Sequence, residues 1–161
     1  MEPVRLVDAW QRNDAKVVED AKAFWRKLQA LPANVSVDER ARELCAVAYI
    51  GDEVVGVSTM ALRHSQLVRC RLGFFRCLVS PAHPDRRIGR RLTVYSRRLL
   101  SDWSKEHPEE KVLGMAAILE APGFDRLGKR PRWPLSGLAL VGYMPDGKQI
   151  RLTWFEHARL D

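Results

Sequence analysis

The sequence predicts one mixed domain of the α/β (α+β) type, and three observations carry this prediction. The chain has 161 residues, enough for a single domain spanning 1–161 with a sizeable core. Its apolar residues switch between the helical period and the strand period along the chain. A strand, an amphipathic helix and a nearly continuous apolar strand follow one another between 71 and 119, which is typical of a βαβ unit.

The first third predicts a strand and two helices. A short edge strand is expected at 4–8, followed by Asn13 and Asp14 as helix caps. A helix is expected over 15–31, because its apolar residues keep to one side and it ends before a proline. A shorter helix is expected within 35–43.

The middle of the chain changes to the strand period. Strands are expected at 44–50 and 54–62, joined by a Gly-Asp-Glu hairpin, and at 71–80. A helix over 88–105 and a buried parallel strand over 111–119 complete the βαβ unit. The apolar stripe of this helix steps by three or four residues and comprises Ile88, Leu92, Tyr95, Leu99 and Trp103.

The last third combines a long loop with a closing hairpin. The loop 120–136 is rich in proline, glycine and basic residues. Strands at 137–143 and 149–155 flank the turn signal Asp146-Gly147. The predicted element order is β-α-α-β-β-β-α-β-β-β.

Composition excludes several classes of protein. No apolar run could span a bilayer, and the N-terminus is neither basic nor followed by an apolar segment, so we expect a cytoplasmic protein with no membrane partner. The three cysteines form no CxxC pair, which argues against a disulfide framework or a zinc site and favours core positions. The net charge of +7 indicates affinity for polyanions or phosphorylated ligands, and nucleic acid stays a possible partner.

Six arginines crowd the predicted helix start: Arg86, Arg87, Arg90, Arg91, Arg97 and Arg98. A helix N-terminus already carries partial positive charge, so cations there are locally unfavourable. Two interpretations stay open. The arginines form a solvated face, or the helix start is an anion site in which backbone N–H groups and guanidinium groups together hold a phosphate.

The residues that enter this helix resemble a motif of the GCN5-related N-acetyltransferase (GNAT) superfamily. In that family the fourth strand runs into V-x-P-x-x-R/Q-x-x-G-x-G/A, and Val79, Pro81 and Gly89 keep this register here. Pro84 replaces the usual Arg or Gln and has no N–H to donate. Arg87 replaces the first glycine, which is possible only if its backbone dihedrals are ordinary. Side-chain contacts from Arg86, Arg87 and Arg90 are the expected compensation.

The resemblance implies a GNAT-like, mixed and mostly antiparallel central sheet flanked by helices. It also implies an N-acetyltransferase that moves an acetyl group from acetyl-CoA directly to an amine of an acceptor. Main-chain groups of Leu78 and Val79 would then hold the pantetheine arm and polarise the thioester carbonyl. The pyrophosphate would lie against the amides of four residues: Arg86, Arg87, Gly89 and Arg90.

The acid and base of this reaction are not given by a motif, because the tyrosine that many family members carry after the fifth strand has no counterpart. Glu120 and Tyr143 are the catalytic candidates. The alternatives are an exposed loop carboxylate for Glu120 and a core-facing strand residue for Tyr143. None of the four histidines has ligand spacing, and no metal is expected. Trp133 either caps an acceptor site or anchors the proline-rich loop.

Two other functions remain open at this point. The first is a nucleic-acid-binding or nucleic-acid-modifying protein on the same fold, with the arginines and the basic residues 129–132 contacting phosphates. The second is a catalytically inactive CoA-binding module. A homodimer is possible, because the final strands often pair across a dimer in this superfamily.

Overall fold

Seven strands form one mixed sheet in the computed structural model of the chain, which describes residues 1–120 and 128–161. The strand order is β1-β2-β3-β4-β5-β7-β6; β4 and β5 run parallel, whereas β1–β2, β2–β3, β5–β7 and β6–β7 are antiparallel. The strands are β1 (Val4–Asp8), β2 (Leu44–Ile50), β3 (Glu53–Ser65), β4 (Cys70–Val79), β5 (Val112–Ile118), β6 (Ala139–Tyr143) and β7 (Gln149–Trp154). The helices are α1 (Ala15–Leu28), α2 (Val37–Ala41) and α3 (Ile88–Glu106), with short 3₁₀ turns η1 (Pro84–Arg86) and η2 (Pro108–Glu110). The predicted class and element order are confirmed.

The chain divides into two compact units, each built from two segments. The first unit holds 1–60 and 77–99, and the second holds 61–76 and 100–161. β3, β4 and α3 each contribute residues to both units. The single domain expected over 1–161 stays a prediction. In the described part of the chain, no helix combines the length and apolarity needed to cross a membrane.

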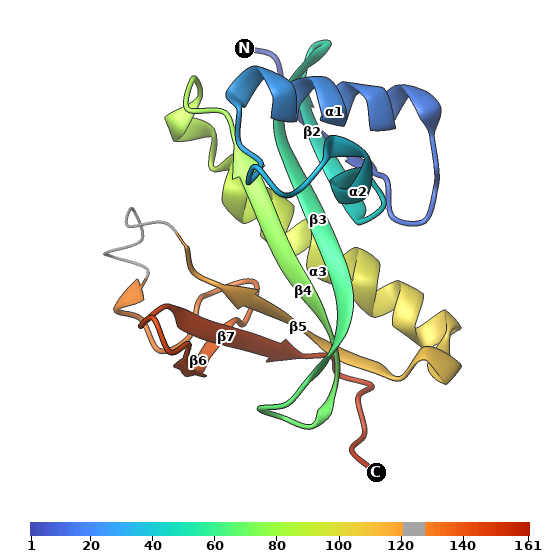
Figure 1. Cartoon of the computed structure of the whole chain (residues 1–161), viewed down its shortest axis with the longest axis vertical. Coiled ribbons are helices and arrows are strands. Elements are labelled where there is room, and N and C mark those ends of the chain that lie inside the picture. The colour runs from blue at the N-terminus through green and yellow to red at the C-terminus, as the bar shows by residue number, and fades with distance from the viewer. Residues whose placement is uncertain (121–127) are drawn as a thin grey trace. The chain divides into compact units, whose positions relative to one another are not determined.

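In the first unit, α1 covers one face of the strands. The Asp14 carboxylate caps the helix by accepting hydrogen bonds from the amides of Lys16 and Val17 at 3.0 and 3.3 Å. The apolar side of α1 and its strand partners form a buried cluster that includes Ala21, Phe24, Trp25, Val47 and Tyr49. Within the first unit, Figure 1 shows α1 in front of the strands and the first turns of α3 behind them.

On the other face of this unit, small residues let α3 approach the sheet closely. A Cβ placed on Gly56 of β3 would lie 2.8 Å from Ile88 Cγ2 and 2.9 Å from Leu92 Cδ1. One turn further along the helix, the Ser58 and Ser96 hydroxyls share a buried hydrogen bond of 2.8 Å. Gly56 therefore fixes how deeply the first turns of α3 rest on β3.

The second unit contains β5, β7 and β6 and a segment held by a buried arginine. The Arg151 side chain is fully buried and donates to the Gln149 Oε1, Gly128 and Leu138 oxygens at 2.8 to 3.4 Å. Its guanidinium lies 4.7 Å from the centre of the Trp133 ring. Burial lowers the pKa of Arg151. Trp133 thus anchors the loop, as the second of its two interpretations expected.

Several boundaries and burial expectations need correction. β3 runs three residues beyond the predicted end, to Ser65, and α1 ends at Leu28 instead of 31. The predicted loop 120–136 lies partly outside the described residues, and its described part includes a bridge between Arg132 and Ala139. The core position expected for all three cysteines holds only for Cys45; Cys70 is half-buried and Cys77 is exposed. Burial raises the Cys45 pKa to about 12, so the thiol stays protonated.

Gly56 offers a direct test of this packing. We expect Gly56→Ala to lower the free energy of unfolding by about 1–3 kcal/mol, because the added Cβ would have to push α3 off β3. Urea denaturation measures this change. Gly142→Ala is the matched control, since a Cβ there would meet only Leu67 Cδ2 at an ordinary 3.7 Å. An equal effect of the two substitutions would contradict the close approach.

Candidate functional site

The segment between β4 and α3 is a tight, ordered loop. The amide of Ser80 donates to the Val55 carbonyl at 2.8 Å, which ties the loop start to β3. The Ser80 hydroxyl then accepts a hydrogen bond from the Ala82 amide at 3.3 Å. Pro84 opens the 3₁₀ turn η1, where its missing N–H and fixed φ cause no conflict. The proline that departs from the family motif is therefore accommodated by a local turn.

Arg87 has a left-handed backbone, with φ of 53° and ψ of 37°. The expectation of ordinary dihedrals at this position is therefore wrong. The turn out of η1 into α3 places this residue in the left-handed region, which glycine adopts most easily. Arginine adopts it at a cost of about 1–2 kcal/mol.

The first turn of α3 has backbone N–H groups without partners in the helix itself. The first backbone bond back along this helix runs from the Arg91 amide to the Arg87 carbonyl at 3.0 Å, so the helix itself supplies no carbonyl for the amides of Ile88, Gly89 and Arg90. A Cβ on Gly89 would meet only Val79 Cγ2, at 3.6 Å. Packing does not require glycine there, whereas close approach of an anion to the amides does favour it.

The three arginine side chains assigned to this loop are arranged differently. Arg86 donates from Nη2 to the Glu2 carbonyl at 2.6 Å, so in this structure it holds the N-terminal segment. Arg87 and Arg90 are exposed, and neither forms an ion pair with a described residue. Two exposed guanidinium groups thus lie at the helix start, and neither is paired with an anion of residues 1–120 or 128–161.

Leu78 and Val79 lie at the end of β4 and face opposite sides of the first unit. Leu78 packs against the α1 cluster, and Val79 packs against the cluster beneath α3. The register of β4 with β5 runs from Arg71 to Phe74, so both residues lie beyond the last described pair. Their side chains anchor the strand end, which leaves their main-chain groups outside this ladder.

In the second unit, Glu120 and Tyr143 lie at the same end of the sheet. The amide of Leu119 donates to the Gln149 carbonyl at 3.0 Å, and Tyr143 pairs with Gln149 from the other side. The two candidates therefore flank β7, about 10 Å apart at two strand spacings. Both are exposed, and Tyr143 at 61% exposure corrects the core-facing alternative.

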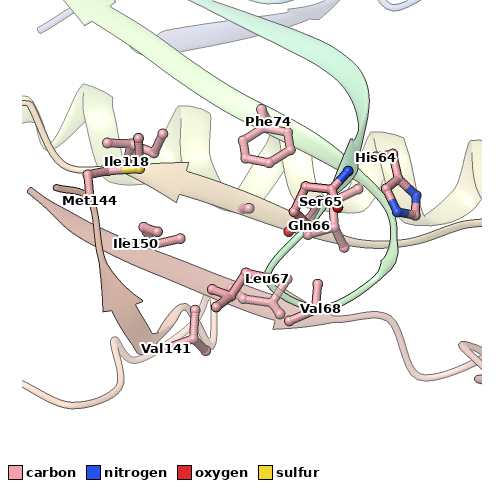
Figure 2. Close-up of a pocket in the computed structure, with 13 residues that line it drawn as sticks. His64, Ser65, Gln66, Leu67, Val68, Phe74, Ile118, Val141, Met144 and Ile150 are labelled. Atoms are coloured by element: carbon pink, nitrogen blue, oxygen red, sulfur yellow. The ribbon is translucent and has the colours of Figure 1, made fainter.

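An apolar pocket of about 260 Å³ lies beside this end of the second unit. In Figure 2, His64 lies at one end of the pocket, whereas Ile118 and Met144 lie at the other. These two residues are close neighbours of Glu120 and Tyr143 in the sequence. Leu67, in the turn after β3, closes one side of the pocket and is 55% exposed. Sequence reasoning missed this pocket, and its one signal was the pair of apolar residues Leu67 and Val68 within the turn between β3 and β4.

The histidines serve structural roles where their contacts are described. His157 Nε2 lies 2.7 Å from the Ser104 hydroxyl, and burial lowers the His157 pKa. His107 Nδ1 lies 2.9 Å from the Trp103 carbonyl. Within 1–120 and 128–161, no three His, Cys, Asp or Glu side chains gather in a way that could hold a metal ion.

Comparisons with known proteins identify the fold of this chain. A scan against protein-family models finds no match, and a search of curated protein sequences finds none either. The chain is similar to a GNAT superfamily phosphinothricin acetyltransferase from Sinorhizobium meliloti in complex with AcCoA, with a TM-score of 0.59 and 15% identity over 96% of this chain and 90% of that chain. It is similar to an aminoglycoside 6'-N-acetyltransferase complexed with coenzyme A, with a TM-score of 0.56 and 15% identity over 98% and 99% of the two chains.

A putative acetyltransferase from Salmonella typhimurium with its cofactor acetyl-CoA gives a TM-score of 0.53 and 18% identity over 98% of both chains. The chain has the GNAT fold. These likenesses cover 98% and 96% of this chain, so they extend over nearly its full length. At such identities the similarity establishes the GNAT architecture, and the reaction must be argued from the site.

The left-handed residue gives a testable consequence of the loop geometry. We expect Arg87→Gly to raise the free energy of unfolding by about 1 kcal/mol, because glycine adopts φ of 53° without a Cβ conflict. Chemical denaturation measures the change. Arg87→Ala is the matched control, since it removes the same charge and keeps the Cβ. Equal stabilities of the glycine and alanine variants would show that the backbone is not strained there.

Proposed function

We propose that this protein is an acetyl-CoA-dependent N-acetyltransferase that acts on an amine. The observation that carries the proposal is the start of α3 on the GNAT fold. There, the amides of Ile88, Gly89 and Arg90 lack helical partners, and two exposed arginines lack protein anions among the described residues. Converging N–H groups and guanidinium groups are the chemistry that a diphosphate requires.

The residues present fit such a ligand. Gly89 has no side chain that would cover the start of α3. The close packing at Gly56 and the Ser58–Ser96 hydrogen bond hold α3 in place on β3. The arginines at 87 and 90 would neutralise the diphosphate. The main-chain groups of Leu78 and Val79, beyond the β4–β5 register, would hold the pantetheine arm. Bound acetyl-CoA supplies the thioester from which the acetyl group is transferred.

The proton transfers are assigned to the second unit. Glu120 would accept the proton that the acceptor amine loses as its nitrogen bonds to the acyl carbon. The Tyr143 hydroxyl would donate a proton to sulfur as the C–S bond breaks. Their sequence neighbours Ile118 and Met144 line one end of an apolar pocket, and His64 lies at the other end. This lining favours an acceptor that carries an uncharged, apolar group.

Calorimetric titration with CoA tests the binding part of the proposal. We expect saturable binding by the wild type and a loss of at least about tenfold in affinity for Arg90→Glu, because the substitution places a carboxylate beside the diphosphate. Arg26→Glu, an equal charge change on exposed α1, is the matched control. Absence of heat at millimolar CoA, or an equal loss in the control, would refute the site.

The chemical step needs its own measurement. With acetyl-CoA present, release of the free CoA thiol is followed over a panel of aliphatic and aromatic amines, for the wild type and for Glu120→Gln. Turnover that favours amines with apolar groups and falls in the variant supports the acetyltransferase. Tight CoA binding with no turnover over the whole panel would instead identify an inactive CoA-binding module.

A further inference from the structure

Most of the net positive charge of this protein lies in one short segment, which covers η1, Arg87 and the first part of α3. Six arginines and one aspartate lie within 84–99, which gives this segment a net charge of +5 out of +7 for the whole chain. The rest of the chain is therefore close to balanced. A localised basic segment, in contrast to a uniformly basic surface, is the electrostatic footprint of a bound polyanion.

The structure arranges the exposed arginines along one side of α3. Arg90, Arg91 and Arg98 fall within an arc of about 100° on the helix. This arc lies opposite the buried side, which includes Ile88, Leu92 and Ser96. Arg87 precedes the first helical residue at the same end. We name these four exposed residues the arginine stripe: Arg87, Arg90, Arg91 and Arg98.

No described carboxylate forms an ion pair with an arginine of the stripe. None of its members takes part in an ion pair with a residue in 1–120 or 128–161. Asp85, the acidic residue nearest in sequence, belongs to η1, and Asp8 of β1 is paired with Arg12 at 2.9 Å. Arg98 instead lies 5.0 Å from the Tyr95 ring centre, which supports its side chain without cancelling its charge.

We propose that the arginine stripe is a docking surface for the phosphate backbone of a double-helical nucleic acid. Guanidinium groups bind phosphate oxygens in a bidentate manner, and the stripe extends over about 12 Å from Arg90 to Arg98 at 1.5 Å per residue. A straight row of cations fits a partner whose charges are regularly spaced and face outward.

The character of the exposed side chains favours a duplex over other polyanions. The large exposed hydrophobic side chains of the described residues include none from α3, so this helix offers a membrane nothing to insert. The stripe also lacks an exposed aromatic ring on which unpaired bases could stack, whereas single-strand binding combines charge with such stacking. Contact with the backbone alone suits a helix whose bases are stacked inside.

This inference does not rest on the proposed acetyl transfer. Arg87 and Arg90 serve both, but Arg91 and Arg98 lie beyond the residues assigned to the diphosphate. A variant at these two positions therefore separates the two proposals. Its CoA affinity, measured by calorimetry, is expected to equal that of the wild type whether or not it binds nucleic acid.

The test uses fluorescence anisotropy with a labelled 20-base-pair DNA duplex between 50 and 200 mM KCl. The full chain is expected to bind with a steep salt dependence, at a slope of about −0.9 per phosphate contact. The double variant Arg91→Gln/Arg98→Gln is expected to bind at least about tenfold more weakly at 100 mM KCl and to reduce the slope by about 1.8. The matched control is Arg26→Gln/Lys27→Gln on exposed α1, which makes the same charge change and should alter affinity by less than about threefold.

Several results would overturn the proposal. One is absence of duplex binding at 50 mM KCl. Another is an equal loss of affinity in the stripe and control variants, because net charge alone would then explain the loss. Tighter binding to a 20-nucleotide oligouridylate, to polyglutamate or to phosphatidylserine vesicles than to the duplex would assign the stripe to that partner instead. Circular dichroism of both double variants confirms that they are folded when compared.

Discussion

The close contact between α3 and β3 is the constraint on which the candidate site depends. Gly56 leaves room for Ile88 and Leu92, and the Ser58–Ser96 hydrogen bond fixes the helix one turn later. A helix seated this firmly keeps its first amides in one place, and preorganised donors bind an anion without the entropic cost of ordering them. The packing of small residues inside the first unit thus positions the candidate anion site at the start of α3.

The loop shows how a main-chain site tolerates an altered sequence. Pro84 removes one donor, and Arg87 replaces a glycine, yet the chain still enters α3 through a left-handed residue. The conformational energy cost at Arg87 is offset only if its guanidinium group forms a favourable interaction at this position. An exposed cation beside free amides is useful toward phosphate, which gives the strained residue a physical reason.

Most elements could be predicted from the sequence because each carries a local signal. The Asp14 cap, the alternating strands and the apolar side of α3 from Ile88 to Trp103 follow from backbone and burial rules that act over a few residues. The conformation of Arg87 could not be predicted in this way, since the turn and not the residue type decides it. The exposure of Tyr143 and the pocket beside Leu67 likewise depend on which strand forms the sheet edge, and this is set by long-range pairing.

Amide chemical shifts test the central claim most directly, because they report on the backbone groups themselves. In ¹⁵N-labelled protein titrated with CoA, the largest shifts are predicted at Ile88, Gly89 and Arg90, with smaller ones at amides of α1. CoA binding that leaves these three amides unmoved, or no shift anywhere at millimolar CoA, would contradict the account.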